Sequence, residues 1–260
     1  MNPFLFGPES ERLFGLYLPP KAGAEKRMGI VLCPPIHQEF LRSRWSLRQV
    51  STQLTRAGLH VLRFDWYGFG DSGGEPTDGT PERWIEDIRL ACKELKEISG
   101  VSTISLVGMR SGATLAAHAA ASGLEIKDLV LLDPVVSGSD YLEGLRGLHR
   151  RRWEAFPYPR TSIREEQREE ILGFMYNRAQ VQAIGGLDLP ATPPAVTGGI
   201  HWIRTQSAAP VAPPSGWIER VRLSDLQDAA GWDRLESIQE ALVAGQIPPA
   251  VLNALGVKAV

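Results

Sequence analysis

This 260-residue sequence has little cysteine, almost no net charge and no long hydrophobic run. Its two cysteines, Cys33 and Cys92, have no metal-like spacing and are too few for a disulfide framework. We therefore expect two small buried side chains in a reducing compartment. The formal net charge of −2 gives no electrostatic reason to expect nucleic acid or an anionic membrane as the main partner.

Signals for export or membrane insertion are also lacking. The first residues, MNPFLFGPESERLF, contain neither a basic region nor the apolar run of a secretory signal peptide. No stretch approaches the roughly 20 apolar residues that a membrane-spanning helix needs. We expect a cytoplasmic protein that uses no metal ion and no cofactor.

Strand and helix patterns alternate along the first half of the chain. Such alternation at βαβ lengths predicts an α/β fold with a mostly parallel sheet and helices on both faces. Two later strands and a closing helix complete the pattern. The predicted strands are 12–20, 28–35, 59–66, 102–108, 127–134, 200–206 and 217–226, and the predicted helices are 46–58, 81–98, 111–123 and 236–247.

The alternation breaks after Asp133. From Gly138 to about Asp188 the sequence is highly charged and its pattern is helical, which we interpret as helices with solvated faces. We therefore predict a core formed by residues 1–137 and 196–260. A helical cap, residues 138–195, interrupts this core after the sixth strand.

Three segments carry a recognisable order of motifs: VLRFDWYGFGDSGG, LVGMRSGATLA and LVLLDPVVSG. They resemble the D-x-x-G-x-G-x-S turn, the nucleophile elbow and the strand before the cap in the α/β-hydrolase superfamily. This resemblance implies the α/β-hydrolase fold. The chain is more closely similar to hydrolase-like proteins associated with the exosortase protein-sorting system, through G-x-R-x-G at the elbow and EEILGF in the cap. That similarity implies a role in a biosynthetic or polysaccharide/protein-sorting operon.

The elbow has arginine where the hydrolase motif G-x-S-x-G has serine. This tight turn needs small residues two positions before and two positions after its central residue, because backbones approach closely there. Gly108 and Gly112 flank Arg110 in this way, whereas the flanks of Ser111 are Met109 and Ala113. We predict that the turn presents Arg110 and that Ser111 caps the following helix.

The other members of a serine triad are missing from the places that the resemblance implies. No Asp or Glu occurs between Ile200 and Gly216, where the acid is expected, and Trp232 occupies the place of the histidine. No histidine follows His201. The order Ser, acid, His cannot be built, which argues against Ser–His–acid chemistry.

Polar residues nevertheless surround the predicted pocket. Arg110 next to a helix N-terminus needs an anion, which could be Glu39, Asp133 or a ligand. The candidate catalytic residues are Arg110, His37, Glu39 and Asp133, with Ser111 as an alternative nucleophile. The candidate ligand-binding residues, several in the predicted loop 34–44, are Pro35, Gln38, Arg42, Arg44, Met109, Ser111 and Trp232.

Each candidate has a structural alternative. Arg110 could form a buried ion pair with Asp133, Arg42 and Arg44 could face solvent, and His37 could bond to the backbone. Our main hypothesis is a pseudo-hydrolase that binds an anionic or acyl-type small molecule or serves a protein partner. The alternative is an ester or thioester hydrolase, or an acyl-transfer enzyme, with His37 or Glu39 as base.

Overall fold

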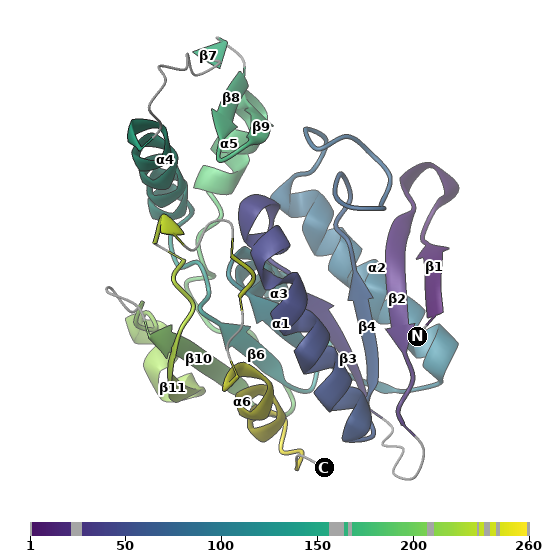
Figure 1. Cartoon of the computed structure of the whole chain (residues 1–260). Coiled ribbons are helices and arrows are strands. Elements are labelled where there is room, and N and C mark those ends of the chain that lie inside the picture. Colours follow the sequence, from purple (N-terminus) through teal and green to yellow (C-terminus); the bar gives the residue numbers. More distant parts are fainter. Residues whose placement is uncertain are drawn as a thin grey trace.

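An eight-stranded sheet forms the centre of the structure (Figure 1). The computed structural model describes residues 2–21, 28–155, 164–165, 168–206, 211–232, 234–236, 240–242 and 245–258. The strand order is β1-β2-β4-β3-β5-β6-β10-β11, with antiparallel pairing of β1 with β2 and of β2 with β4. The five remaining pairings are parallel, which confirms the predicted α/β fold with a mostly parallel sheet.

Most of the sequence patterns correspond to observed elements. An extra edge strand, β1, was not predicted, because Pro3 and the following Gly7-Pro8 disguise it; edge strands tolerate proline. The strands of the large sheet are β1 (Asn2–Phe6), β2 (Leu13–Leu18), β3 (Met28–Cys33), β4 (His60–Phe64), β5 (Thr103–Met109), β6 (Leu129–Leu132), β10 (Ile200–Gln206) and β11 (Val221–Ala229).

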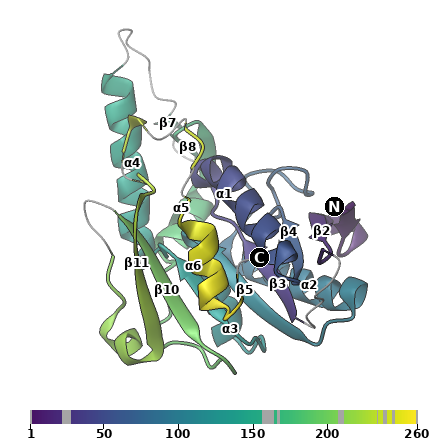
Figure 2. The same cartoon turned by 60° about the horizontal axis from the view of Figure 1, so that its bottom comes forward.

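Helices cover both faces of this sheet. On one face, α2 (Pro81–Ser99) and α3 (Ser111–Ala121) pack against a cluster that includes the fully buried Trp84 and Leu131. On the other face, α1 (His37–Arg56) and α6 (Ile247–Ala254) pack against a second cluster that includes Val61 and Val130. Figure 2 shows α1 and α6 in front of the sheet. The strands β3, β5 and β6 are largely apolar because both of their faces are buried.

Two predicted boundaries were wrong. The predicted loop 34–44 is largely helix, because α1 begins at His37 rather than near Ser46. The predicted closing helix over 236–247 is not present in its described residues, and α6 begins where that prediction ended. Pro248 and Pro249 lie in the first turn of α6, where proline's missing N–H is tolerated. Residues 237–239 and 243–244 of that prediction lie outside the described residues.

The segment from Gly138 to Gly185, between β6 and β10, lies beyond the carboxyl ends of the parallel strands (Figure 1). It was predicted to be helical, and it begins with α4 (Gly138–Glu154) and closes with α5 (Arg178–Gly185). Between them, however, lies a small sheet of β7 (Arg164–Glu165), β8 (Arg168–Ile171) and β9 (Phe174–Asn177). The remaining residues of the predicted helices, 156–163 and 166–167, lie outside the described residues.

A tight hairpin explains the small sheet. Leu172 and Gly173 connect β8 to β9 with φ values of 54° and 91°. Two successive positive φ angles are typical of the two-residue turns that match the twist of a β-hairpin. Leucine is an unusual residue at the first of these positions, so the sequence pattern did not reveal the turn.

The turn from β5 into α3 depends on close backbone contact. A Cβ atom on Gly112 would overlap the carbonyl oxygens of Pro34 and Cys33, which belong to the end of β3 and cannot move aside easily. Gly144 in α4 is a contrasting position, because nothing lies near the place of its missing Cβ.

We therefore expect Gly112→Ala to lower the free energy of unfolding by about 3 kcal/mol, as overpacking does in rigid surroundings. The matched variant Gly144→Ala should instead raise it, by up to about 1 kcal/mol, because alanine is the better helix former. Urea unfolding followed by circular dichroism measures both changes. Equal stabilities of the two variants would contradict the predicted close contact.

Candidate functional site

Arg110 is the central residue of the turn between β5 and α3. Its backbone has φ 54° and ψ −126°, a sparsely populated conformation for a residue with a side chain. Gly108 and Gly112 allow this turn because neither has a Cβ atom. A Cβ on Gly108 would overlap the backbone of Ala113, and a Cβ on Gly112 would overlap the carbonyl oxygens at the end of β3. The predicted register of the turn therefore agrees with the backbone geometry.

The carboxylate of Glu39, in the first turn of α1, binds the guanidinium of Arg110. Arg110 Nε donates a hydrogen bond to Glu39 Oε1 at 2.9 Å, and the two side chains are only 16% and 4% exposed. The hydroxyl of Tyr141, in α4, donates to Glu39 Oε2 at 3.2 Å. Burial alone would lower the pKa of Arg110, but the charge and hydrogen bond of Glu39, together with Tyr141 and Asp133, outweigh burial and raise that pKa. Arg110 is therefore held as a buried cation with an internal counterion.

Asp133, directly after β6, does not form the alternative ion pair with Arg110. Its carboxylate accepts hydrogen bonds from the Thr205 backbone N–H at 2.8 Å and the Thr205 hydroxyl at 2.6 Å. It also accepts one from Trp232 Nε1 at 2.8 Å. Arg110 reaches only the backbone carbonyl of Asp133, at 3.2 Å. The hypothesis of an Arg110–Asp133 carboxylate pair was wrong, because Thr205 and Trp232 occupy the carboxylate oxygens.

Trp232 lies between two guanidinium groups. The central carbons of Arg110 and Arg42 lie 5.2 Å and 5.1 Å from the centre of its indole ring, within the range of cation–π attraction. Arg42 is buried and donates to the carbonyl oxygens of Ala230, Gly231 and Glu240. The alternative that Arg42 faces solvent was therefore wrong, and Arg42 fixes the backbone on both sides of Trp232.

Ser111 is the first residue of α3, and its hydroxyl forms no hydrogen bond with an imidazole of the described residues. Its side chain is fully buried, and its hydroxyl accepts a hydrogen bond from the Ile36 N–H at 3.0 Å. All five histidines lie within the described residues, and no hydrogen bond joins any of them to Ser111. An activated serine needs a base within hydrogen-bond reach.

His37, the first residue of α1, is enclosed by aromatic rings. The rings of Phe69, Phe174 and Tyr176 lie 4.7, 5.5 and 4.2 Å from its own, centre to centre. Neither imidazole nitrogen has a hydrogen-bond partner among the described residues, so the alternative of a bond to the backbone was wrong. Burial lowers the pKa of His37 to about 3, so the ring is neutral at physiological pH.

A cavity of about 540 Å³ lies between the turn and α4, a volume suited to a small organic molecule. Four of the predicted site residues line this cavity together: Arg110, Glu39, Asp133 and Trp232. Pro35, Met109 and Ser111 are buried and His37 faces the aromatic rings, so none of these lines the cavity. Arg44 lines a different cavity, and Gln38 is half-buried in α1.

Several residues of this site were not predicted. Tyr141 and the other residues that α4 contributes were treated as part of a solvated helix. The spacing of Tyr141, Leu145 and Leu148, all buried on one face of α4, could have indicated a face directed at the core. Thr205 gave no signal in the sequence, because its contact with Asp133 depends on the register between β6 and β10.

No group of three or more metal-ligating side chains occurs in the described part of the chain. Nor is any helix there long and apolar enough to cross a membrane. Within the range from Ile200 to Gly216, where the acid of a triad was expected, residues 207–210 lie outside the described residues.

Solved structures of other proteins have the same fold. Est1E from Butyrivibrio proteoclasticus, bound to ferulic acid, is 17% identical, with a TM-score of 0.64 over 97% of this chain and 99% of that one. An α/β serine hydrolase without a lid from Xanthomonas campestris is 15% identical, with a TM-score of 0.61 over 100% and 96% of the two chains. These similarities show the α/β-hydrolase fold. No curated protein is significantly similar in sequence.

The family assignment comes from the sequence between α1 and α5. The family model described as serine aminopeptidase, S33, matches residues 40–183, which is more than half of the chain. This span includes the turn at Arg110, Asp133 and the whole of α4. The chain therefore belongs to the serine aminopeptidase S33 family of α/β hydrolases.

Proposed function

We propose that this chain is a pseudo-hydrolase, which binds a small acyl-type molecule in the cavity beside Arg110 without hydrolysing it. The observation that carries the proposal is the arrangement of Arg110, Trp232 and Asp133. In our interpretation these side chains replace the serine, histidine and acid of a hydrolase, because Trp232 donates to Asp133 as a catalytic imidazole would.

The replacements remove the chemistry of a triad while keeping its packing. An indole N–H is a donor only, so Trp232 cannot accept a proton from a nucleophile. A protonated guanidinium is not a nucleophile, and burial and its bond to Ile36 hold Ser111 out of the cavity. Loss of a single triad member typically reduces turnover by about 10⁴-fold. The loss of two members together supports a binding role.

The charges around the cavity support an acyl ligand more than an anionic one. Its described lining contains three arginines and four carboxylates. The guanidinium of Arg110, which would attract an anion most directly, is already paired with Glu39. Leu145, Leu148 and Val211 add apolar surface that suits a hydrocarbon chain. We also propose that the protein is cytoplasmic and serves a protein partner, as its similarity to the exosortase-associated proteins implies.

The competing hypothesis of an unconventional enzyme has less support. It requires His37 or Glu39 to act as base, yet His37 contacts rings rather than the cavity and Glu39 is committed to Arg110 and Tyr141. A general base must be within hydrogen-bond reach of the proton that it removes. Neither side chain meets this requirement in the described geometry.

Reaction with a fluorophosphonate probe tests the proposal. We expect no labelling of the purified protein and no hydrolysis of p-nitrophenyl butyrate above background, because no base activates Ser111. Ser111→Ala should behave identically in both assays. Labelling of the wild type that disappears in Ser111→Ala would overturn the proposal.

The Arg110–Glu39 pair should be a structural unit. Arg110→Met or Glu39→Gln alone should lower the free energy of unfolding by about 3 kcal/mol, because each leaves its buried partner uncompensated. The double variant should recover most of this loss. Arg150→Met, which breaks the exposed pair with Glu143, is the matched control and should change stability by less than about 0.5 kcal/mol. Additive effects of the two single variants, in urea unfolding, would be inconsistent with this pair.

Neutral, buried His37 predicts a specific pH dependence of stability. The folded state has the lowered pKa of about 3, whereas the unfolded chain has the ordinary value near 6.5. The unfolded state therefore binds an extra proton between these values, and the free energy of unfolding decreases as pH falls through this window. Relative to His37→Leu, which lacks the titrating imidazole, the free energy of unfolding of the wild type should fall by up to about 1.4 kcal/mol per pH unit in this window. Parallel curves for the two proteins, measured by urea unfolding from pH 7 to pH 4, would refute this expectation.

A further inference from the structure

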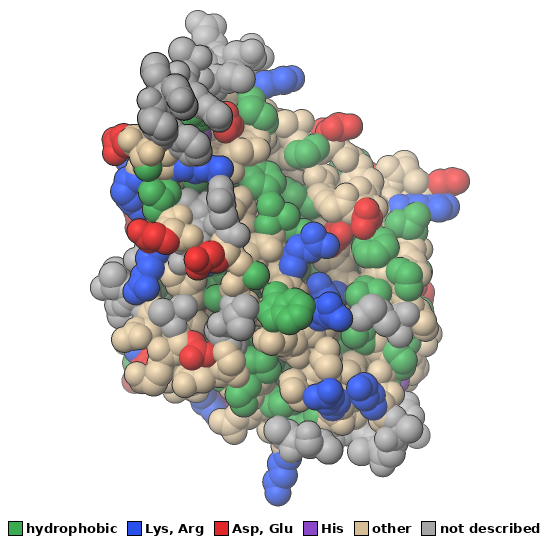
Figure 3. Space-filling model, in the orientation of Figure 1, with side chains coloured by type: hydrophobic (Ala, Val, Ile, Leu, Met, Phe, Trp, Pro, Cys, Tyr) green, Lys and Arg blue, Asp and Glu red, His purple; other side chains and the backbone are tan. Residues whose placement is uncertain are grey.

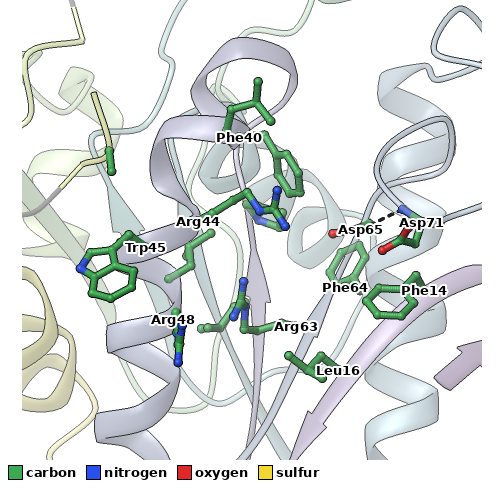
Figure 4. Close-up of a pocket in the computed structure, with 15 residues that line it drawn as sticks. Phe14, Leu16, Phe40, Arg44, Trp45, Arg48, Arg63, Phe64, Asp65 and Asp71 are labelled. Atoms are coloured by element: carbon green, nitrogen blue, oxygen red, sulfur yellow. Dashed lines mark hydrogen bonds between the residues drawn. The ribbon is translucent and has the colours of Figure 1, made fainter. Parts of the chain in front are cut away.

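A second cavity, of about 550 Å³, lies on the opposite side of α1 (Figure 4). It shares no lining residue with the cavity beside Arg110. Its base is formed by β2 and β4, and one wall is formed by the solvent-facing side of α1. Leu18 of β2 is buried in the cluster under α1, whereas Leu16 of the same strand is only partly buried and lines the cavity. The proposed function leaves this cavity unexplained.

Three arginines line the cavity. Arg44 and Arg48 lie one turn apart on α1, and Arg63 lies on β4. None of them forms an ion pair with a carboxylate of the described residues. Burial lowers the pKa of Arg63, and the positive charges of Arg44 and Arg48 lower it further, against the opposing effect of Asp65. The three cations therefore repel one another and are incompletely neutralised.

Two carboxylates set the charge balance at the other end of the cavity. Asp65 and Asp71 both line it, and Asp65 Oδ2 accepts a hydrogen bond from the Asp71 N–H at 3.1 Å. This contact holds Asp65 in the turn after β4, and its negative charge offsets the positive charges of Arg44 and Arg63 only in part. Three cations against two anions leave a formal excess of one positive charge, which a single negative charge would neutralise.

The remaining lining is apolar and strongly aromatic. Phe14, Phe40 and Phe64 contribute rings, and Trp45 and Leu41 of α1 are 45% and 51% exposed at the rim. Figure 3 shows basic and hydrophobic side chains side by side over α1. In Figure 4, Arg44 and Arg63 lie between Trp45 on one side and Phe64 on the other. An ionic group at the arginines would thus have apolar surface next to it.

We infer that this cavity is a second ligand site, which binds a monoanionic carboxylate that carries an aryl or acyl tail. Arg44 and Arg63 hold the carboxylate, because guanidinium groups match its two oxygens. The tail packs on Trp45 and Leu41 at the rim, where apolar and aromatic surface is otherwise exposed to water. The volume is that of an ordinary small-molecule site.

Calorimetric titration of the full chain with 4-phenylbutyrate tests the inference. We expect saturable binding that weakens several-fold between 50 and 500 mM salt, since both Arg44 and the cavity mouth are exposed. Arg63→Met and Arg44→Gln should each weaken binding about 10-fold or more, because each removes a charge-assisted hydrogen bond. Arg56→Gln is the matched control, since Arg56 is an exposed arginine of the same helix outside the cavity, and it should leave the affinity unchanged.

Matched probes and one distant variant complete the design. The neutral 4-phenylbutanamide should bind at least 10-fold more weakly, and 4-phenylbutyl phosphate should bind no more tightly than the carboxylate at pH 8. Arg150→Met, a variant in the lining of the first cavity that is expected to keep its stability, should not change the affinity for 4-phenylbutyrate. Failure of 4-phenylbutyrate to bind, equal binding of the amide, tighter binding of the phosphate, or loss of binding in Arg150→Met would each overturn the inference. Retention of binding in Arg63→Met and Arg44→Gln would also overturn it.

Discussion

The burial of a guanidinium at the carboxyl edge of the sheet is the constraint on which the rest of the site depends. Taking the charge of Arg110 out of water is favourable only if an anion and further hydrogen bonds replace the solvent. Glu39 supplies the anion, Tyr141 satisfies its second oxygen, and the Asp133 carbonyl accepts from the guanidinium. These partners come from α1, α4 and the end of β6. One charge thus fixes the relative positions of three segments that are far apart in sequence.

On the function proposed above, this arrangement also explains how a hydrolase scaffold keeps its packing without hydrolase chemistry. The turn that would present a nucleophile still has its strained backbone and its two close glycine contacts. Its strain now positions a structural ion pair rather than a reactive oxygen. Trp232 retains a hydrogen bond to Asp133, so the packing between β6, β10 and the segment after β11 is preserved. The fold and the packing of its site are separable from the reaction.

The sequence was most informative where a single local rule determines the structure. The buried strands and α2 follow from apolar runs and helical spacing, and the register at Arg110 follows from the flanking glycines. It was least informative where partners lie far apart along the chain. The choice of Glu39 rather than Asp133 as the counterion depends on α1 beginning at His37, which the sequence pattern placed in a loop. The hairpin at Leu172 was missed because leucine rarely occupies such a turn.

The contacts of Arg42 link the beginning of the chain to its end. This residue of α1 binds carbonyl groups nearly 200 residues later, at Ala230, Gly231 and Glu240. Contacts of such large sequence separation carry a high loop-closure cost, and they require the distant partner to have been synthesised. During synthesis, α1 therefore leaves the ribosome long before its partners. The wall of the Arg110 cavity that contains Trp232 closes only when the last part of the sheet has been added, so a chain truncated before Trp232 would lack this wall of the cavity.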